Sequence, residues 1–491
     1  MTNQWIKTFV SYAISTGLWD ELDRVYLTNK VLYLIGLDDY EDDREIEGTL
    51  PVEIVEKLVE VAIDSGKIKS TAHEKDVLIG QLMDIVTPSP KEVNQQFNKN
   101  YETSPEKATD YLYELCKDND YIKTQAIAKN IEFPYDSEYG TLNITINLSK
   151  PEKDPEEIKK AATMKTANYP KCMLCIENEG FSGRIGYPNR FNHRVIQFNL
   201  CDEPWAFQYS PYAYYNEHSI FFSAVHRPMS INKETFTRLV HVLDVFPHYF
   251  VGSNADLPIV GGSILSHDHY QGGRFHFPIE SSPIETSYDI LDFPNVSVGT
   301  VKWPMSVIRV TSDSKEDVID AADYILKKWR DYSDLSLEIK AFSDDGTRHH
   351  TITPIARRKN GLYEMDLVLR DNNVSDKYPD GIFHPHPEYH HIKKENIGLI
   401  EVMGLAILPP RLKEEMQDVK KFLLNQEHNM VDYHKEWAEK IKSTQDITEK
   451  NVDEKIEEAI GEVFLHVLED AGVYKRTQEG QDGFKRFMST L

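Results

Sequence analysis

The sequence predicts an α+β protein, in which an antiparallel sheet core lies between helical regions at the two ends of the chain. Apolar residues recur at helical spacing through about the first 135 residues. From about residue 136 they alternate with polar residues, which is typical of half-buried strands. Helical spacing returns after about residue 410. These observations predict helices, two successive sheet regions, and helices again.

The N-terminal region, residues 1–135, contains clear helix signals. In the segment 49–63, Thr49 is a candidate N-cap and Pro51 lies near the first turn. Apolar side chains follow at every third or fourth position, and the segment 103–115 has the same pattern. We therefore expect this region to be helical.

Two sheet domains are expected in the middle of the chain, over residues 136–290 and 291–410. Segments such as HRVIQFNL, HSIFFSAVH and GLYEMDLVLRD alternate apolar and polar residues, and KETFTRLVHVLDVF (233–246) has helical spacing between strands. The two regions are similar in size, which is compatible with an old duplication. Residues 411–491 are expected to be helical, with Gly472 as a C-terminal stop of one helix.

Composition narrows the classes of function. The 491 residues leave room for several domains. With 80 acidic against 55 basic residues, the formal charge of -25 disfavours binding to nucleic acid or to an anionic membrane. No apolar run approaches the roughly 20 residues that span a bilayer, and the N-terminus lacks the pattern of a signal peptide. We expect a cytoplasmic protein that acts on a small molecule.

The four cysteines are too few and too unevenly spaced for a disulfide scaffold. Cys172 and Cys175, however, have the two-residue spacing that lets both thiolates reach one tetrahedral ion. A complete site needs two more ligands. The alternative is a reduced pair without a metal.

The stretch GGSILSHDHYQGG, residues 261–273, combines histidines, a glutamine and glycines. On a strand, His267, His269 and Gln271 would project from one face, roughly 7 Å apart. The flanking glycines would let a phosphate approach main-chain N–H groups. A neutral imidazole can attack phosphorus near neutral pH, and the resulting phosphorus–nitrogen bond can pass its group onward. The stretch therefore suits reversible nucleotidyl transfer, although a structural turn or a metal site is the alternative for an isolated histidine pair.

The longer stretch DLPIVGGSILSHDHYQGG, residues 256–273, resembles the motif of the class II galactose-1-phosphate uridylyltransferases, which are similar to the wider histidine-triad superfamily. The resemblance implies a histidine-triad-like sheet core and a ping-pong reaction. A histidine takes uridylyl from UDP-glucose, releases glucose 1-phosphate, and passes the uridylyl group to galactose 1-phosphate. By likeness to the superfamily, the second histidine of the motif, His269, is the nucleophile.

The resemblance also suggests substrate contacts. Gln271 would donate its amide to a phosphoryl oxygen, as Ser263 and the amide of Gly262 could. Asn254 resembles the family's nucleotide-contacting asparagine. In WAFQYSPYAYYNEH, the resemblance places Tyr209 and Ser210 near the base and ribose, and the alternative is a strand and turn that fill the core. In ENIGLIEVMG, Asn396 and Glu401 resemble class I sugar contacts, and the alternative is an amphipathic strand or the start of a helix.

A zinc site is implied by a second resemblance. His226 and His267 match, in order and approximate spacing, zinc ligands of the class I uridylyltransferases, which also suggest a homodimer. With Cys172 and Cys175 they would complete a set of four protein ligands, which leaves no open position for substrate. We expect a structural zinc.

Two other histidine-containing segments are less similar to the motif. FHPHPEYHH (383–391) lacks the glutamine and the glycines, so it is expected to be a loop that could line the hexose site or hold a second metal. HHTITPIARR (349–358) lies where a duplicated catalytic strand would, but it has Thr and Ile at the histidine positions.

The sequence thus favours a uridylyltransferase of galactose metabolism. The alternatives are another histidine-triad nucleotidyltransferase or phosphorylase, and a zinc-braced nucleotide-binding scaffold without turnover.

Overall fold

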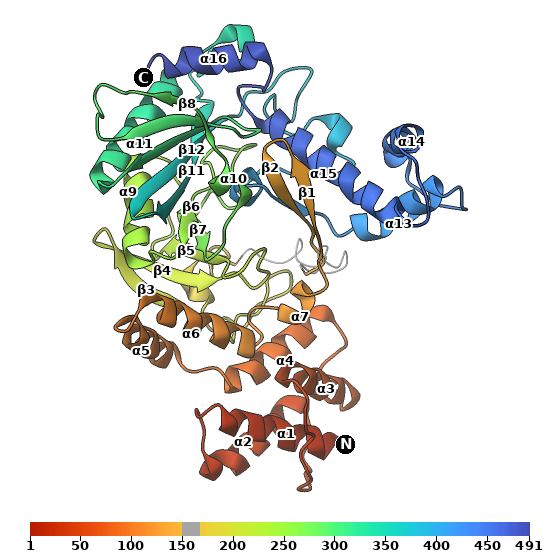
Figure 1. Cartoon of the computed structure of the whole chain (residues 1–491). Coiled ribbons are helices and arrows are strands. Elements are labelled where there is room, and N and C mark those ends of the chain that lie inside the picture. The colour runs from red at the N-terminus through yellow and green to blue at the C-terminus, as the bar shows by residue number, and fades with distance from the viewer. Residues whose placement is uncertain (150–166) are drawn as a thin grey trace.

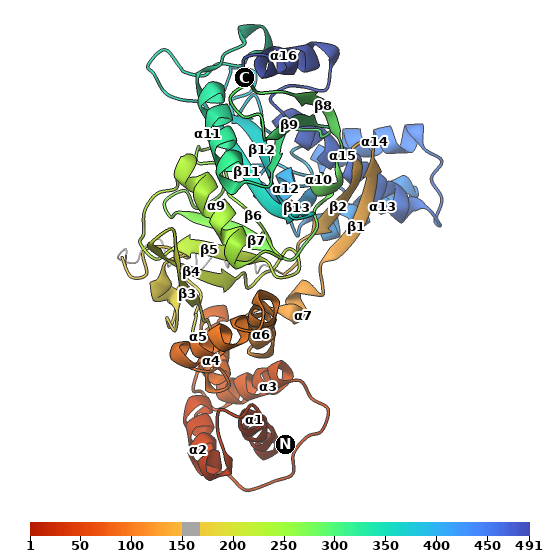
Figure 2. The same ribbon diagram turned by 60° about the vertical axis from the view of Figure 1, so that its left-hand side comes forward.

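The computed structural model describes residues 1–149 and 167–491 and confirms the predicted α+β class (Figure 1). The chain begins with seven helices. They are α1 (Thr2–Ser15), α2 (Arg24–Ile35), α3 (Pro51–Asp64), α4 (Ala72–Ile85), α5 (Pro90–Tyr101), α6 (Pro105–Asp118) and α7 (Thr124–Ile127). The helices α1 to α4 share a hydrophobic core of their own at the far end of the molecule, whereas α5 and α6 pack against the main core (Figure 2).

Local sequence explains where these helices start. Ser89 and Ser104 accept hydrogen bonds from the first turns of α5 and α6, and a proline follows each serine. At α3 the expected cap is wrong by one residue. Leu50 occupies the N-cap position, and the Glu53 carboxylate accepts from its backbone N–H at 3.2 Å. Thr49 therefore lies outside the helix.

Ten strands form one continuous sheet in which every neighbouring pair is antiparallel. Their order is β3-β4-β5-β7-β6-β11-β12-β10-β9-β8. The strands are β3 (Ile196–Leu200), β4 (Glu203–Tyr209), β5 (Ser219–Ser223), β6 (Phe250–Gly252), β7 (His269–Gly273), β8 (Ile284–Tyr288), β9 (Ser297–Val301), β10 (Val307–Ser312), β11 (His350–Lys359) and β12 (Leu362–Asp371).

The sheet consists of two halves with the same topology. The first half is ordered β3-β4-β5-β7-β6, with α9 (Lys233–Val245) between β5 and β6 in the chain. Read from the other edge, the second half is β8-β9-β10-β12-β11, with α11 (Lys315–Asp331) between β10 and β11. The halves meet where β6 pairs with β11. This arrangement supports a duplication, in which β12 and not the expected β11 is the counterpart of β7.

The two faces of the sheet are covered differently. Helices α9 and α11 pack on one face over the larger core (Figure 2). The other face meets a small sheet of β1 (Ile131–Ser137), β2 (Gly140–Ile146) and β13 (Leu405–Leu408), together with C-terminal helices. The remaining α-helices in the described parts of the chain are α10 (Pro278–Ser281), α12 (Leu399–Val402), α13 (Leu412–Leu423), α14 (Lys435–Thr444), α15 (Val452–Ala471) and α16 (Gln478–Met488).

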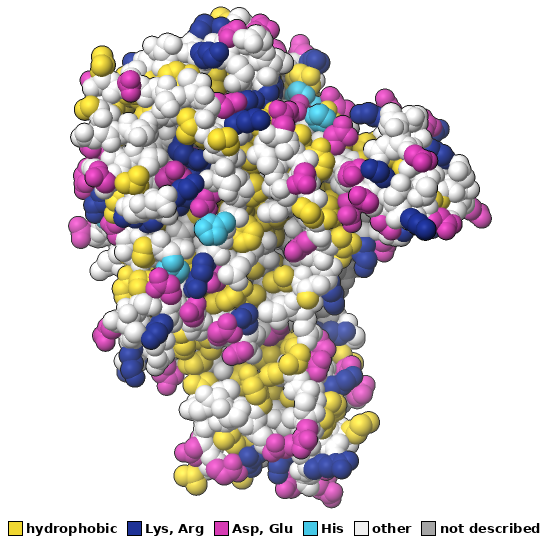
Figure 3. Space-filling model, viewed as in Figure 1, with side chains coloured by type: hydrophobic (Ala, Val, Ile, Leu, Met, Phe, Trp, Pro, Cys, Tyr) yellow, Lys and Arg dark blue, Asp and Glu magenta, His cyan; other side chains and the backbone are white. Residues whose placement is uncertain are grey.

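The distribution of surface charge and the lengths of the apolar helices agree with what the composition predicts. On the face shown in Figure 3, Lys and Arg side chains are interspersed with Asp and Glu and gather into no continuous patch. Among the described residues, no helix combines the length and the apolar character needed to cross a membrane.

Candidate active site and metal centre

The central strand β7 carries the histidine and the glutamine of the motif. Its register with β5 pairs Phe222 with His269 and Ile220 with Gln271. Because alternate residues share a face, both polar side chains point away from the face that α9 covers. The expected strand also included His267, but β7 begins at His269.

The glycines of this stretch serve close packing within the protein. A Cβ on Gly272 would lie 2.6 Å from the carbonyl oxygen of Phe250 on β6. A Cβ on Gly262 would lie 2.6 Å from the Asn254 amide nitrogen. Side chains at these positions would separate segments that form the site. The structure thus gives these two glycines a packing role, and their clearance for phosphate stays a prediction.

The imidazole of His269 has a defined tautomer. Its Nδ1–H donates to the carbonyl oxygen of His267 at 2.7 Å, which leaves the lone pair on Nε2. Burial, together with the neighbouring His267, lowers the pKa of His269 to about 4, so the ring is neutral at pH 7. Among the described residues, no group forms a hydrogen bond with Nε2. His269 thus has the protonation state that a nucleophile requires.

A second histidine, His218, orients the amide of Gln271. The backbone N–H of Tyr214 donates to His218 Nδ1 at 3.5 Å, so His218 Nε2 carries the proton and donates to Gln271 Oε1 at 2.9 Å. The Gln271 NH₂ group is left as a donor. Sequence reasoning gave His218 no role, because it lies 53 residues from Gln271.

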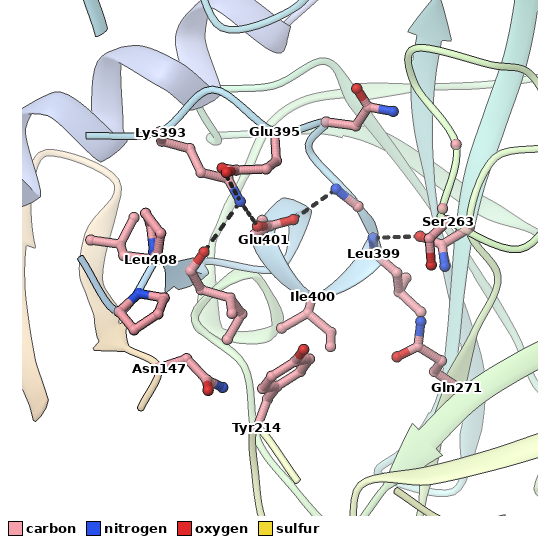
Figure 4. Close-up of a pocket in the computed structure, with 18 residues that line it drawn as sticks. Asn147, Tyr214, Ser263, Gln271, Lys393, Glu395, Leu399, Ile400, Glu401 and Leu408 are labelled. Atoms are coloured by element: carbon pink, nitrogen blue, oxygen red, sulfur yellow. Dashed lines mark hydrogen bonds and ion pairs between the residues drawn. The ribbon is translucent and has the colours of Figure 1, made fainter. Parts of the chain in front are cut away.

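Gln271 lines a cavity of about 780 Å³ at the edge of β7 (Figure 4). His269 lies beside this cavity on the same strand face, although its own atoms do not line it. Asn254, Gly262 and Ser263 contribute to one wall. The opposite wall comes from the segment 393–401 and from β13, and six of the nine residues predicted for catalysis or substrate binding meet here: Asn254, Gly262, Ser263, Gln271, Asn396 and Glu401.

One hydrogen bond joins the two walls, and two others fix the wall that carries Asn396 and Glu401. The Asn254 Oδ1 atom accepts from the backbone N–H of Leu399 at 2.9 Å. Asn396 Oδ1 lies 3.1 Å from His384 Nε2, so the histidine-rich loop supports this wall from behind. The Glu401 Oε2 atom accepts from the Gly398 N–H at 2.8 Å. The two walls of the cavity are therefore held in one arrangement.

Lys393 is the main residue of the cavity that sequence reasoning missed. It is 4% exposed, pairs with Glu401, and donates to the Ile407 carbonyl oxygen at 3.2 Å. Figure 4 shows its ammonium group between Glu401 and Glu395. Burial lowers its pKa, but these two carboxylates outweigh burial, so the net shift is upward. Lys393 is therefore charged. It lies in the polar run KKEN (393–396), which does not predict a buried residue.

Two predicted contacts are not brought to the cavity. Tyr209 is 0% exposed on the helix-covered face, and its hydroxyl bonds to Thr109 and Tyr249. Ser210 follows it in a turn, where its N–H donates to the His218 carbonyl oxygen at 2.8 Å. Neither residue lines the cavity. The cause for Tyr209 is strand alternation, which points it with Phe207 into the core.

The four predicted metal ligands come together. Their ligand atoms all lie within 4.8 Å of one another. The Cys172 and Cys175 sulfurs are 3.6 Å apart, His267 Nδ1 lies 3.2 Å from the Cys172 sulfur, and His226 Nδ1 lies 3.2 Å from the Cys175 sulfur. Two sulfurs each about 2.3 Å from a tetrahedral ion would be about 3.8 Å apart. The cluster could therefore hold a metal ion.

Neighbouring groups orient the ligands for that role. The His267 Nε2–H donates to the Ser223 carbonyl oxygen at 2.7 Å, so its Nδ1 lone pair faces the sulfurs. Asn178 donates to the carbonyl oxygens of both cysteines and holds the loop that carries them. An ion bound here would connect this loop to the segment that follows β5 and to the segment that precedes β7.

Comparisons with known proteins identify relatives over the whole chain. A family model described as the galactose-1-phosphate uridyl transferase N-terminal domain matches residues 17–228, and the C-terminal domain of the same family matches residues 242–439. A protein of Enterococcus faecalis named galactose-1-phosphate uridylyltransferase is 55% identical over 491 residues, which cover 100% of this chain and 99% of the relative. A protein of the same name from Streptococcus mutans is 52% identical, with 99% of each chain covered.

Among solved structures, the chain is similar to yeast Ap4A phosphorylase Apa2. The TM-score is 0.36 at 11% sequence identity, and the match covers 66% of this chain and 92% of that one. A likeness this weak supports no statement about function.

Proposed function

The chain belongs to the galactose-1-phosphate uridylyltransferase family, and we propose that it moves uridylyl between UDP-glucose and galactose 1-phosphate through a uridylyl-histidine intermediate on His269. Uridylyl transfer in galactose metabolism follows from the family. The observation that carries the proposed mechanism is the neutral imidazole of His269, with its Nε2 lone pair unengaged among the described residues, beside a cavity lined by Gln271.

The reaction balances without an added reagent. His269 Nε2 attacks the α-phosphorus of UDP-glucose, a phosphorus–nitrogen bond forms, and the bond to the bridging oxygen breaks so that glucose 1-phosphate leaves with the electron pair. A phosphate oxygen of galactose 1-phosphate then attacks the same phosphorus, and the phosphorus–nitrogen bond breaks to release UDP-galactose. The His267 carbonyl oxygen, which accepts from Nδ1–H, stabilises the positive ring of the intermediate.

Other cavity residues are assigned by position. The Gln271 NH₂ group, oriented by His218, would donate to a phosphoryl oxygen, together with Ser263 and the Gly262 N–H. We propose that Asn254 contacts the nucleotide. Asn396 and Glu401, on the opposite wall, would contact the hexose.

We propose that zinc occupies the Cys172, Cys175, His226 and His267 cluster. Two thiolates and two imidazoles form a donor set that zinc prefers, and four protein ligands leave no open position. The ion would brace the backbone next to the nucleophile and take no part in the transfer. We also propose a cytoplasmic enzyme that forms a homodimer, which sedimentation of the purified protein would test.

Trapping of the intermediate tests this function. Enzyme mixed with UDP-glucose labelled in the α-phosphate and then denatured should carry base-stable, acid-labile label. The His269→Asn variant should carry none, whereas His276→Asn, whose side chain is 91% exposed, should be labelled like wild type. Label on His269→Asn, or no label on folded wild type, would reject the mechanism. The latter outcome would favour the phosphorylase or scaffold alternatives.

A further inference from the structure

A second cavity, of about 860 Å³, lies in the C-terminal part of the molecule and shares no lining residue with the first. We refer to it as the C-terminal cavity. Its walls come from the segment 387–391, from Arg411, from α14 and the turn before it, and from α15. Figure 1 shows α13 and α14 projecting from the body of the molecule at this end, next to α15.

Aromatic rings form much of its wall. Tyr389 stacks on His466 with ring centroids 5.4 Å apart, and His391 lies 5.1 Å from Trp437. Tyr433 lines the cavity as well. Flat rings of this kind bind the C–H faces of ligand rings and bury large areas at small entropic cost.

A chain of three buried or half-buried groups fixes the tautomer of His391. The Glu415 carboxylate accepts from His434 Nε2–H at 3.0 Å, so His434 Nδ1 is an acceptor. The His391 Nδ1–H donates to it at 3.0 Å, which leaves the lone pair of His391 on Nε2. Burial, the neighbouring His434 and Arg411 lower the pKa of His391 to about 4. His391, which lines the cavity, is therefore a neutral imidazole whose Nε2 is an acceptor.

Charged groups around the cavity favour a neutral ligand with hydroxyl groups. Three carboxylates, from Glu388, Glu436 and Glu462, line it. The Glu462 carboxylate lies 4.0 Å from Lys440 and 3.7 Å from His466, whose pKa is raised by Glu469 and Glu462. Arg411 and Lys440 are the two cations of the lining. One of these, Arg411, is engaged by Glu415 at 2.6 Å and by the His391 carbonyl oxygen at 2.9 Å. Phosphate esters would be repelled, whereas several O–H donors would find acceptors. Among the described residues, only the Cys172 cluster gathers three metal-ligating side chains, so a metal is not indicated.

We propose that the C-terminal cavity binds an unphosphorylated hexose or hexoside. A pyranose ring stacks on Trp437, one hydroxyl donates to His391 Nε2, and others donate to the carboxylates of the rim. The inference concerns a site separate from the uridylyl-transfer cavity and does not rest on the mechanism proposed for His269.

Calorimetric titration of the intact, metal-loaded enzyme with D-galactose and with lactose tests the proposal. Saturable binding is expected, and Trp437→Ala should weaken it at least tenfold because the stacking surface is lost. Glu436→Gln with Glu462→Gln, a conservative pair, should weaken it severalfold in a protein that keeps the fold. His428→Gln, on the same helical arm but outside the cavity, should bind like wild type.

Two further titrations distinguish the proposed site from the first cavity, and the proposed ligand from other ligands. Glu401→Gln alters the first cavity, so sugar binding that this variant abolishes would place the ligand there and overturn the proposal. No saturable binding of either sugar, or binding that Trp437→Ala leaves unchanged, would also overturn it. Tighter binding of choline than of galactose would identify a different ligand class and overturn the proposal. The label-trapping assay on the same preparation reports separately on uridylyl transfer.

Discussion

At the scale of single residues, the tautomer and the orientation of the reactive groups depend on neighbouring groups that take no part in the reaction. The carbonyl oxygen of His267 fixes the tautomer of His269. His218, which directly precedes β5, fixes the orientation of the Gln271 amide. A histidine that accepts from a backbone N–H can donate only through its other nitrogen. The orientation of the glutamine amide is therefore a property of a hydrogen-bonded chain.

The role of His218 is testable by a double-mutant cycle. Gln271→Ala should lower kcat by about 100-fold, the usual cost of losing a donor to a developing oxyanion. His218→Phe should lower kcat by about tenfold, with KM little changed, because the amide is present but no longer oriented. In the Gln271→Ala background, His218→Phe should have almost no further effect. Equal effects of His218→Phe in both backgrounds would show that it acts independently of Gln271.

Lys393 makes a prediction about both stability and binding. Lys393→Met would leave Glu401 buried without its cation, which should cost about 3 kcal/mol of unfolding free energy and raise KM for the hexose 1-phosphate. Since the raised pKa keeps this lysine charged at neutral pH, its contribution should be present there and be lost only in strong alkali. Urea denaturation and initial rates measure the two effects. Lys394→Met is the control, because the side chain of Lys394 is exposed.

At the scale of elements, period and capping signals predicted much of the fold. α15 ends at Ala471, directly before the predicted stop Gly472, where a Cβ would lie 2.8 Å from the Pro304 carbonyl oxygen. Short-range patterns could not show which strands are equivalent, since strand order is set by pairings between distant segments. β12, the counterpart of β7, carries Asp366. Its carboxylate accepts hydrogen bonds from Arg309 and Arg357. In the second half, the strand that corresponds to β7 thus carries an ion-paired carboxylate.

The candidate site could be predicted in part for the same reason. Residues within the glycine-rich motif are neighbours in sequence, so His269, Gln271 and Ser263 could be predicted together. Lys393 and His218 reach the site only through folding, and neither has a local signature. Tyr209 lies away from the cavity because it shares the core-facing side of β4 with Trp205 and Phe207, and the sequence did not show which face of this strand the core would cover.

The proposed metal makes a prediction at this scale. Chelation should lower Tm by several degrees, because an ion that binds only the folded state stabilises it. Metal analysis should find about one zinc per chain in wild type and in Cys201→Ser, whose cysteine is exposed and outside the cluster. Cys172→Ser should lose the metal and show the lower Tm without chelator. Full zinc content in Cys172→Ser would exclude this cluster as the site.

At the scale of the whole molecule, two short chain segments connect the two cavities. Residues 387–391 line the C-terminal cavity, and the same segment continues to Lys393, Glu395 and Asn396 in the first cavity. The Lys393 N–H donates to the Tyr389 carbonyl oxygen at 2.9 Å. Likewise Pro409 and Pro410 line the first cavity and Arg411 lines the second. A ligand in one cavity therefore contacts chain segments that continue into the wall of the other.

A sugar in the C-terminal cavity should consequently change the affinity of the first. Ordering the segment 387–396 would fix Lys393 and Glu401 before the hexose 1-phosphate arrives, so part of the ordering cost is already met. We expect galactose to lower KM for galactose 1-phosphate about fivefold, within the usual range of coupling between sites. Direct competition in the first cavity would instead raise KM. Trp437→Ala should abolish the decrease in KM and leave any competition unchanged, so initial rates with both proteins separate coupling from competition.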